Sequence, residues 1–254
     1  GIIEKSPNDM NSFEKYEKVE VAKAGHLSLK MNENIDVDLT VTKRSGIGKF
    51  SFDNSNYGTL IIGTGINSSP PENIKDAFVK ITSDSSCEGY TRGGDFCGTE
   101  SDYKIYFAAE FDRPSIYNGT WKEKKLSTKK SSSGKNSGAY FTFETNEIDK
   151  INYRIAISFV SIENAKENLK NEEKHLTFEE YQRETSKEWD KYLSAIKIKS
   201  KNEDRIKQFY THFYHSLIHP NIVSDVNGEY MGADFKVHKT KENREQYSSF
   251  SVWD

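Results

Sequence analysis

Apolar and polar residues alternate with the period of a β-strand through much of the chain before residue 160. The first clear case is residues 35–41, where Ile35, Val37, Leu39 and Val41 fall on one face and Asp36, Asp38 and Thr40 on the other. This pattern predicts a half-buried strand. Further strands are predicted at residues 48–52, 59–63, 78–82, 104–111, 138–145 and 151–159. Because turn clusters and no long helices separate these segments, we expect a mainly β chain whose residues 1–160 form an antiparallel β-sandwich.

One segment of this region has no apolar period. Residues 122–138, KEKKLSTKKSSSGKNSG, are small or charged with few exceptions. Such a composition predicts an exposed hairpin loop. A solvated surface explains its lysines more simply than a binding role does.

After Phe159 the pattern takes the period of an α-helix. Thr177 followed by Glu180 is a capping box, which marks the start of a helix. That helix carries one apolar stripe, made of Phe178, Tyr181, Trp189, Tyr192, Leu193 and Ile196. A second helix is predicted at residues 202–218, with Ile206, Phe209, Phe213 and Leu217 on its buried face. Because an amphipathic helix gains most of its stability from packing, this aromatic face needs a partner.

The chain therefore divides into a sandwich at residues 1–160, a helical linker at 161–200 and the beginning of a helical domain at 201–254. The aromatic helix face also fits an oligomer contact, and this alternative stays open.

Composition narrows the class of protein. A hydrophobic content of 34% and a net charge of −3 are typical of a globular chain. The 36 basic residues are balanced by 39 acidic ones and are scattered, so the sequence gives no basic face for nucleic acid. No apolar run is long enough to span a membrane, and the amino terminus is not an intact signal peptide.

Cys87 and Cys97 lie ten residues apart in SSCEGYTRGGDFCGTE, which we interpret as a loop rich in glycine and serine. Such a loop can bring two cysteines within bridging distance. Two cysteines alone do not define a disulfide framework, so a local disulfide and two free thiols both stay open. Zinc is disfavoured because no second pair of soft ligands has a suitable spacing.

Two polar motifs resemble metal sites without meeting their requirements. His212, His215 and His219 can share a helix face, but Ser216 stands where the HExxH motif of zinc proteases requires glutamate. We expect these histidines to form hydrogen bonds at the helix end. The DVNGE segment, residues 225–229, lacks the spacing of a calcium-binding EF-hand, and its Asn-Gly pair predicts a β-turn instead.

Several segments together resemble one protein family. They are YFAAEFDRP (106–114), YNGTW (117–121), SFVSIENAKENL (158–169), FYTHFYHSLIHPNIVSDVNGEYMGAD (209–234) and FSVWD (250–254). They are similar to glycoside hydrolase family 92, the calcium-dependent exo-acting α-mannosidases. The resemblance implies a supersandwich-type β-sandwich packed on an (α/α)6 barrel, with the active site between them. Residues 201–254 would be only the start of that barrel.

The resemblance also assigns roles to residues. Trp253 and Asp254 would form the subsite for the terminal mannose, with Asp254 binding hydroxyls, and Phe96 and Cys97 would help to wall the pocket. The calcium ligands of the family, its catalytic glutamate acid and its aspartate base correspond to positions beyond Asp254. We therefore assign no catalytic residue and no metal ligand in this chain. Glu110 and Asp112 are interpreted as partners of Arg113 or of the loop backbone.

The sequence thus predicts the amino-terminal part of an inverting glycosidase that removes terminal α-linked mannose, of the α-1,2 type, from glycans. On its own the chain is expected to be inactive. Because the substrates are glycans, we expect a secreted or cell-surface protein. The alternative is a non-catalytic carbohydrate-binding sandwich.

Overall fold

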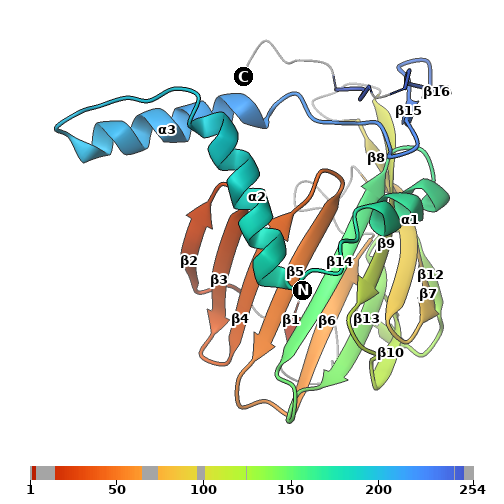
Figure 1. The fold of residues 1–254 in the computed structure, drawn as a ribbon. Coiled ribbons are helices and arrows are strands. Elements are labelled where there is room, and N and C mark those ends of the chain that lie inside the picture. Colours follow the sequence, from red (N-terminus) through yellow and green to blue (C-terminus); the bar gives the residue numbers. More distant parts are fainter. Residues whose placement is uncertain are drawn as a thin grey trace.

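Two antiparallel sheets face each other in the computed structural model, which describes residues 2–3, 15–64, 74–95, 101–123, 125–242 and 244–248 (Figure 1). Within these residues the larger sheet has nine strands, in the order β12 (Ser131–Ser133), β7 (Ile74–Ser83), β8 (Ser86–Gly94), β9 (Asp102–Phe111), β14 (Lys150–Ser158), β5 (Ser45–Phe52), β4 (Ile35–Val41), β3 (His26–Asn32) and β2 (Lys18–Lys23). The smaller sheet has five, in the order β1 (Ile2–Ile3), β6 (Tyr57–Gly63), β13 (Ser137–Glu144), β10 (Tyr117–Lys122) and β11 (Lys125–Ser127). The predicted β-sandwich is confirmed.

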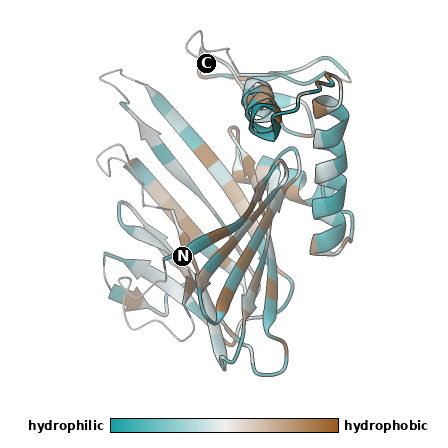
Figure 2. Cartoon of the chain, turned by 90° about the vertical axis from the view of Figure 1, so that its left-hand side faces the viewer, coloured by the Kyte–Doolittle hydropathy of each residue, from teal (hydrophilic) through white to brown (hydrophobic). Residues whose placement is uncertain are grey.

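The core lies between the two sheets. Phe141 of β13 is fully buried, and its ring centroid lies 4.7 Å from that of Phe111 on β9 in the opposite sheet. Phe52 and Ile151 are also fully buried there. Figure 2 shows hydrophobic positions gathered in the strands, while the outward side of the long helix beside them is mostly hydrophilic. Inner faces of sandwich sheets interdigitate in this way, so the period-2 alternation of the sequence decides which side chains enter the core.

Strand β4 follows the predicted alternation at its start and departs from it at its end. Ile35 and Val37 are buried in the core, whereas Val41 is 48% exposed. Thr40, predicted on the polar face, is buried, and its hydroxyl donates to the carbonyl of Gly25 at 2.7 Å. A helix covers the outer face of β4, and a covered outer face does not show the simple inside–outside pattern.

That helix is α2 (Phe178–Leu193), which crosses the outer face of the larger sheet (Figure 1). Its predicted capping box is present, with the Thr177 N–H donating to Glu180 Oε2 at 2.8 Å. Phe178 and Tyr181 pack on Ile47 of β5. A shorter helix, α1 (Ile162–Asn171), packs Ala165 and Leu169 on two alanines of β9 and β14.

The predicted second helix is α3 (Glu203–Ile218), capped by Asn202. It ends where His219 takes an extended conformation before Pro220, as the steric demand of proline predicts. Its Tyr214 ring meets Trp189 of α2 at 4.8 Å, yet none of its residues is buried. Within the described residues, the aromatic face of α3 is therefore only half-buried, and Leu217 at its end is 37% exposed. None of the described helices has the length and apolar character needed to cross a membrane.

Two regions predicted as loops contain strands. In residues 122–138, β11 pairs with β10, and β12 pairs with β7 of the other sheet, so the segment passes from one sheet to the other. The prediction of a loop is wrong for these residues, because edge pairing uses backbone hydrogen bonds and needs no apolar period. The segment that begins at Ser85 was also interpreted as a loop, but residues 86–94 form β8. A Cβ added at Gly89 would lie 2.0 Å from the Phe78 carbonyl oxygen, so this glycine allows the strands to approach closely.

The last described elements are β15 (Glu229–Met231) and β16 (Val237–Lys239), which pair as a small antiparallel hairpin. The hairpin lies beside the end of β8, at the same end of the sandwich as α3 (Figure 1). This placement brings the carboxyl-terminal part of the chain to one end of the larger sheet.

Candidate functional site

A cavity of about 880 Å³ opens where the start of β9 meets the β15–β16 hairpin and residues 246–248. Its walls are rich in aromatic rings, from Tyr103, Tyr106, Phe159, Tyr230, Phe235 and Tyr247. Polar groups stand among them, on Asp102, Lys104, Gln246 and Ser248. Ligand sites have this size and this mixture of apolar surface with a few oriented polar groups.

Asp102 is held as an ionised carboxylate on the cavity wall. Arg92 of β8 donates from Nε to the two carboxylate oxygens at 2.9 and 3.1 Å. The two residues lie diagonally across neighbouring strands, since Arg92 pairs with Lys104 and Gly94 with Asp102. The hydrogen bond from Arg92 holds the pKa of Asp102 below its ordinary value. At neutral pH this group can accept hydrogen bonds from hydroxyls.

A buried carboxylate attaches residues 221–248 to the sandwich. Asp225 is 4% exposed and accepts hydrogen bonds from the Ser158 hydroxyl at 2.7 Å, Asn164 Nδ2 at 2.8 Å and Asn168 Nδ2 at 2.6 Å. The amide oxygen of Asn168 in turn accepts from the N–H of Val226 at 2.9 Å. Hydrogen bonds to an ionised group are stronger than neutral ones, so this cluster fixes the position of the loop that leads into β15.

Arg44, in the turn between β4 and β5, makes a second attachment. Its Nε donates to the Ser224 carbonyl at 2.7 Å, and its guanidinium pairs with Glu172 at 3.3 Å and with Glu245 at 3.5 Å. The Ser224 hydroxyl accepts from the N–H of Gln246 at 3.0 Å. Two walls of the cavity, the hairpin and residues 246–248, are thus tied to the same two residues, Ser224 and Asp225.

The predicted turn in residues 225–229 is confirmed, although it is centred one residue earlier than the Asn-Gly pair. The Gly228 N–H donates to the Asp225 carbonyl at 2.9 Å, and Gly228 has a φ of +84°, which glycine adopts readily. Asn227 Oδ1 accepts from the N–H of Glu229. The Asp225 carboxylate accepts hydrogen bonds from β14 and α1, so this turn holds residues 221–248 against those elements.

The proposed sugar-contacting residues all lie outside the described residues. Phe96 and Cys97 belong to residues 96–100, and Trp253 and Asp254 to residues 249–254. The described residues next to these segments do line the cavity: Asp102 lies shortly after the first segment and Ser248 directly before the second.

Cys87 is a free thiol, 2% exposed, on β8 opposite Ala109. Burial raises the pKa of this thiol far above its ordinary value. A buried, protonated thiol is unreactive, so Cys87 contributes packing. Its predicted alternative partner, Cys97, lies outside the described residues.

Other polar residues singled out in the sequence have structural partners. The predicted pairing of Glu110 and Asp112 with Arg113 or the loop backbone is wrong: Glu110 pairs with Arg154 at 3.2 Å, and Asp112 accepts from Asn152 Nδ2 at 2.8 Å. Both partners project from the neighbouring strand β14, which the sequence alone could not place. Among the described residues, no group of three or more His, Cys, Asp or Glu side chains could hold a metal ion.

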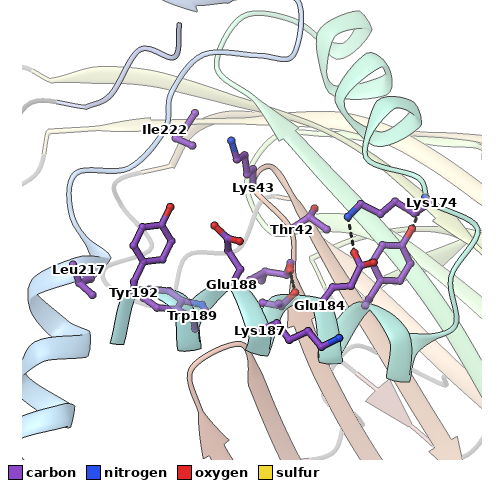
Figure 3. A pocket seen from close by; sticks show the side chains of 13 residues that line it. Thr42, Lys43, Lys174, Glu184, Lys187, Glu188, Trp189, Tyr192, Leu217 and Ile222 are labelled. Atoms are coloured by element: carbon purple, nitrogen blue, oxygen red, sulfur yellow. Dashed lines mark hydrogen bonds and ion pairs between the residues drawn. The ribbon is translucent and has the colours of Figure 1, made fainter. Parts of the chain in front are cut away.

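A second cavity, of about 810 Å³, lies beside α2 (Figure 3). Trp189 and Tyr192 of α2, Leu217 of α3 and Ile222 form one part of its lining, and Lys43 and Glu188 point into it from different elements. The cavity lies between the apolar stripe of α2 and the exposed end of α3.

Sequence reasoning missed the Ser158, Asn164, Asn168 and Asp225 cluster. A signal was present: Asn164 and Asn168 are four residues apart and lie next to Ala165 and Leu169, the buried positions of α1. Asparagines at the buried face of a helix need hydrogen-bond partners. The sequence could have indicated a buried polar contact but not that Asp225 supplies it.

A β-sandwich followed by helices, with an aromatic cavity beside the last hairpin, defines the class of this chain. The profile of the glycosyl hydrolase family 92 N-terminal domain matches residues 3–158, and that of the family 92 catalytic domain matches residues 164–254. The chain belongs to glycosyl hydrolase family 92.

Solved structures agree on the fold. A family GH92 alpha-mannosidase from Bacteroides thetaiotaomicron aligns with a TM-score of 0.79 and 24% identity, over 95% of this chain and 33% of that one. The same enzyme in complex with mannoimidazole gives 0.75 and 24% over 91% and 30%. A family GH92 inverting mannosidase from B. thetaiotaomicron VPI-5482 gives 0.72 and 19% over 90% and 30%. The chain thus spans about a third of the length of these structures. No curated protein matches it.

Proposed function

We propose that this chain is the amino-terminal part of a glycoside hydrolase that removes terminal α-linked mannose from glycans, of the α-1,2 type, with inversion. The observation that carries the proposal is the aromatic cavity bordered by Asp102 and Ser248, in a chain of family 92. The solved relatives are described as alpha-mannosidases, one of them with bound mannoimidazole. We infer a related, mannose-containing substrate here, and a location outside the cell or at its surface.

The proposed roles follow from the chemistry of a neutral sugar. A sugar ring presents apolar C–H faces to aromatic rings and hydroxyls to hydrogen-bonding groups. Trp253 would supply a ring and Asp254 an acceptor at the terminal mannose, while Phe96 and Cys97 would close the wall. We further propose residues 1–160 as the sandwich, 161–200 as the linker and 201–254 as the beginning of the catalytic (α/α)6 domain.

Hydrolysis needs two carboxyl groups on opposite sides of the glycosidic bond. The described lining of the cavity contributes one, Asp102, and this group is already paired with Arg92. We therefore assign the acid and the base to no residue of this chain. Calcium enters the proposal only through the family resemblance, because the described residues do not fit a metal site.

The second cavity supports the expectation that the sandwich and its helices pack on further helical structure. Leu217 and Tyr192, at its edge, are 37% and 50% exposed. We propose that the remainder of the helical domain covers this surface in the longer polypeptide. Exposed apolar surface of this kind is typical of an interface.

A non-catalytic carbohydrate-binding module is the second candidate. The specific observation in its favour is that the described cavity combines a wall rich in aromatic rings with a single carboxylate, which suits binding without hydrolysis.

The test compares the 254-residue chain with the longer polypeptide that contains it. Both are incubated with an α-1,2-linked mannobiose, an α-1,6-linked mannobiose and a β-linked mannoside, and released mannose is measured. We expect the longer polypeptide to release mannose from the α-1,2 substrate fastest, to leave the β-linked mannoside intact and to lose activity with EDTA, and the short chain to be inactive.

Binding of the α-linked sugar without release by either polypeptide would favour the binding module. Release from the β-linked substrate would contradict the proposed specificity.

A further inference from the structure

A row of three aromatic rings crosses the outer face of the larger sheet. Phe78 on β7 pairs with Tyr90 on β8, and Tyr90 pairs with Tyr106 on β9. The ring centroids are 5.9 Å apart for the first pair and 6.0 Å for the second. The strand register therefore sets the rings side by side, at a spacing comparable with the length of one hexose residue.

The row lies outside the core. Phe107, the next residue on β9, is buried between the sheets, so Tyr106 points to the opposite face, the one that carries α1. Two positions further along β9, Ala108 packs under α1. All three rings of the row are half-buried, which leaves part of each accessible beside the helix.

Charged groups border this aromatic row. The Tyr90 hydroxyl donates to Asp76 Oδ2 at 2.7 Å, and Arg92 lies on the same strand two positions further. On the other border, Glu88 pairs with Lys166 of α1. An acyl chain or an apolar helix would place apolar surface against these charged groups and remove them from water, which is unfavourable. A sugar chain fits better, since its ring faces can stack while its hydroxyls meet the charged border.

The row is continuous with the candidate cavity, because Tyr106 and Lys104 line that cavity as well. A glycan whose terminal residue enters the cavity would leave it past Tyr106. From there the rings of Tyr90 and Phe78 extend across two further strands.

We propose that the row Tyr106, Tyr90 and Phe78 is a platform for the inner sugar residues of the glycan, those on the reducing side of the terminal mannose. The proposal rests on the proposed function. It adds a preference for extended oligosaccharides over simple mannosides, determined by the sandwich itself.

Lys104 is the group that such a glycan must displace. Its Nζ lies 3.8 Å from the centre of the Tyr90 ring and 5.5 Å from that of Tyr106. A cation over an aromatic ring at an accessible site is held weakly, and the lysine chain is flexible. Displacement would leave the ammonium free to meet a hydroxyl at the border.

The experiment uses the longer polypeptide with two substrates, 4-nitrophenyl α-mannoside and an α-linked mannotetraose, and measures the ratio of their kcat/KM values. Tyr90→Ala is expected to lower the ratio of long to short substrate about tenfold, the effect of removing one stacking ring. Phe78→Ala, at the far end of the row, should lower it in the same direction. Tyr90→Phe keeps the ring and should keep the ratio.

The matched control is Tyr117→Ala, a tyrosine that is 61% exposed on β10 of the other sheet. It should leave the ratio unchanged. If Tyr90→Ala and Phe78→Ala cleave both substrates with the wild-type ratio, the proposed platform is wrong, while the proposed function still stands. If the unaltered polypeptide cleaves neither substrate, the proposed function fails, and the platform falls with it.

Discussion

Replacing Asp225 with alanine is expected to weaken the attachment of residues 221–248 to the sandwich by about 3 kcal/mol. The substitution leaves the Ser158 hydroxyl and the amide groups of Asn164 and Asn168 without their shared acceptor. Buried donors that lose a charged partner carry a large desolvation cost. The measurement is native-state amide hydrogen exchange at Val226, which should become faster. The N–H of Val226 donates to the amide oxygen of Asn168.

Asp234→Ala is the control for this substitution. Asp234 also accepts a hydrogen bond, from His238 at 2.9 Å, but its side chain is 48% exposed. Its carboxylate accepts from His238 and from the N–H of Lys236, which both lie in the same hairpin. Exchange at Val226 should be unchanged in Asp234→Ala. Equal acceleration in the two variants would contradict the role of Asp225.

Replacing Phe141 with alanine is expected to lower the free energy of unfolding of the sandwich by about 3–5 kcal/mol. Phe141 is fully buried on β13 and lies between the two sheets against Phe111. Truncation would remove buried apolar surface and leave a cavity in the core. Urea unfolding followed by circular dichroism measures the change.

The same substitution at Phe235 is the matched control. Phe235 is 70% exposed, so Phe235→Ala should change the free energy of unfolding by less than about 0.5 kcal/mol. A small effect at Phe141 would mean that the two sheets do not share the tightly packed core described above.

The strands with regular alternation were predictable because their periodicity is imposed by a core on one face. Residues 104–111 and 151–159 lie almost wholly within β9 and β14. β2, KVEVAK, and β3, HLSLKMN, also alternate, and Leu29 and Met31 pack against the core, but the sequence reasoning missed both strands. β8 was missed because its glycines indicate a loop in isolation, whereas Gly89 is needed for close approach to Phe78.

The candidate site was predictable in part. Residue types in the carboxyl-terminal segments indicated the family, whereas the sugar-contacting roles of Phe96, Cys97, Trp253 and Asp254 stay predictions. The cavity is also lined by Asp102, Tyr103 and Tyr106 of β9. The sequence does not show where this strand lies, because its place depends on pairing with β8. The partners of Asp225 are about 60 residues away in sequence, and such contacts depend on tertiary packing.

We propose that sugar binds where the start of β9 meets the β15–β16 hairpin. The most direct test is hydrogen exchange of the longer polypeptide with and without saturating methyl α-mannoside. We expect protection in peptides covering residues 101–106 and 229–248. Protection confined to residues 181–192 and 217–222, around the second cavity, would contradict it.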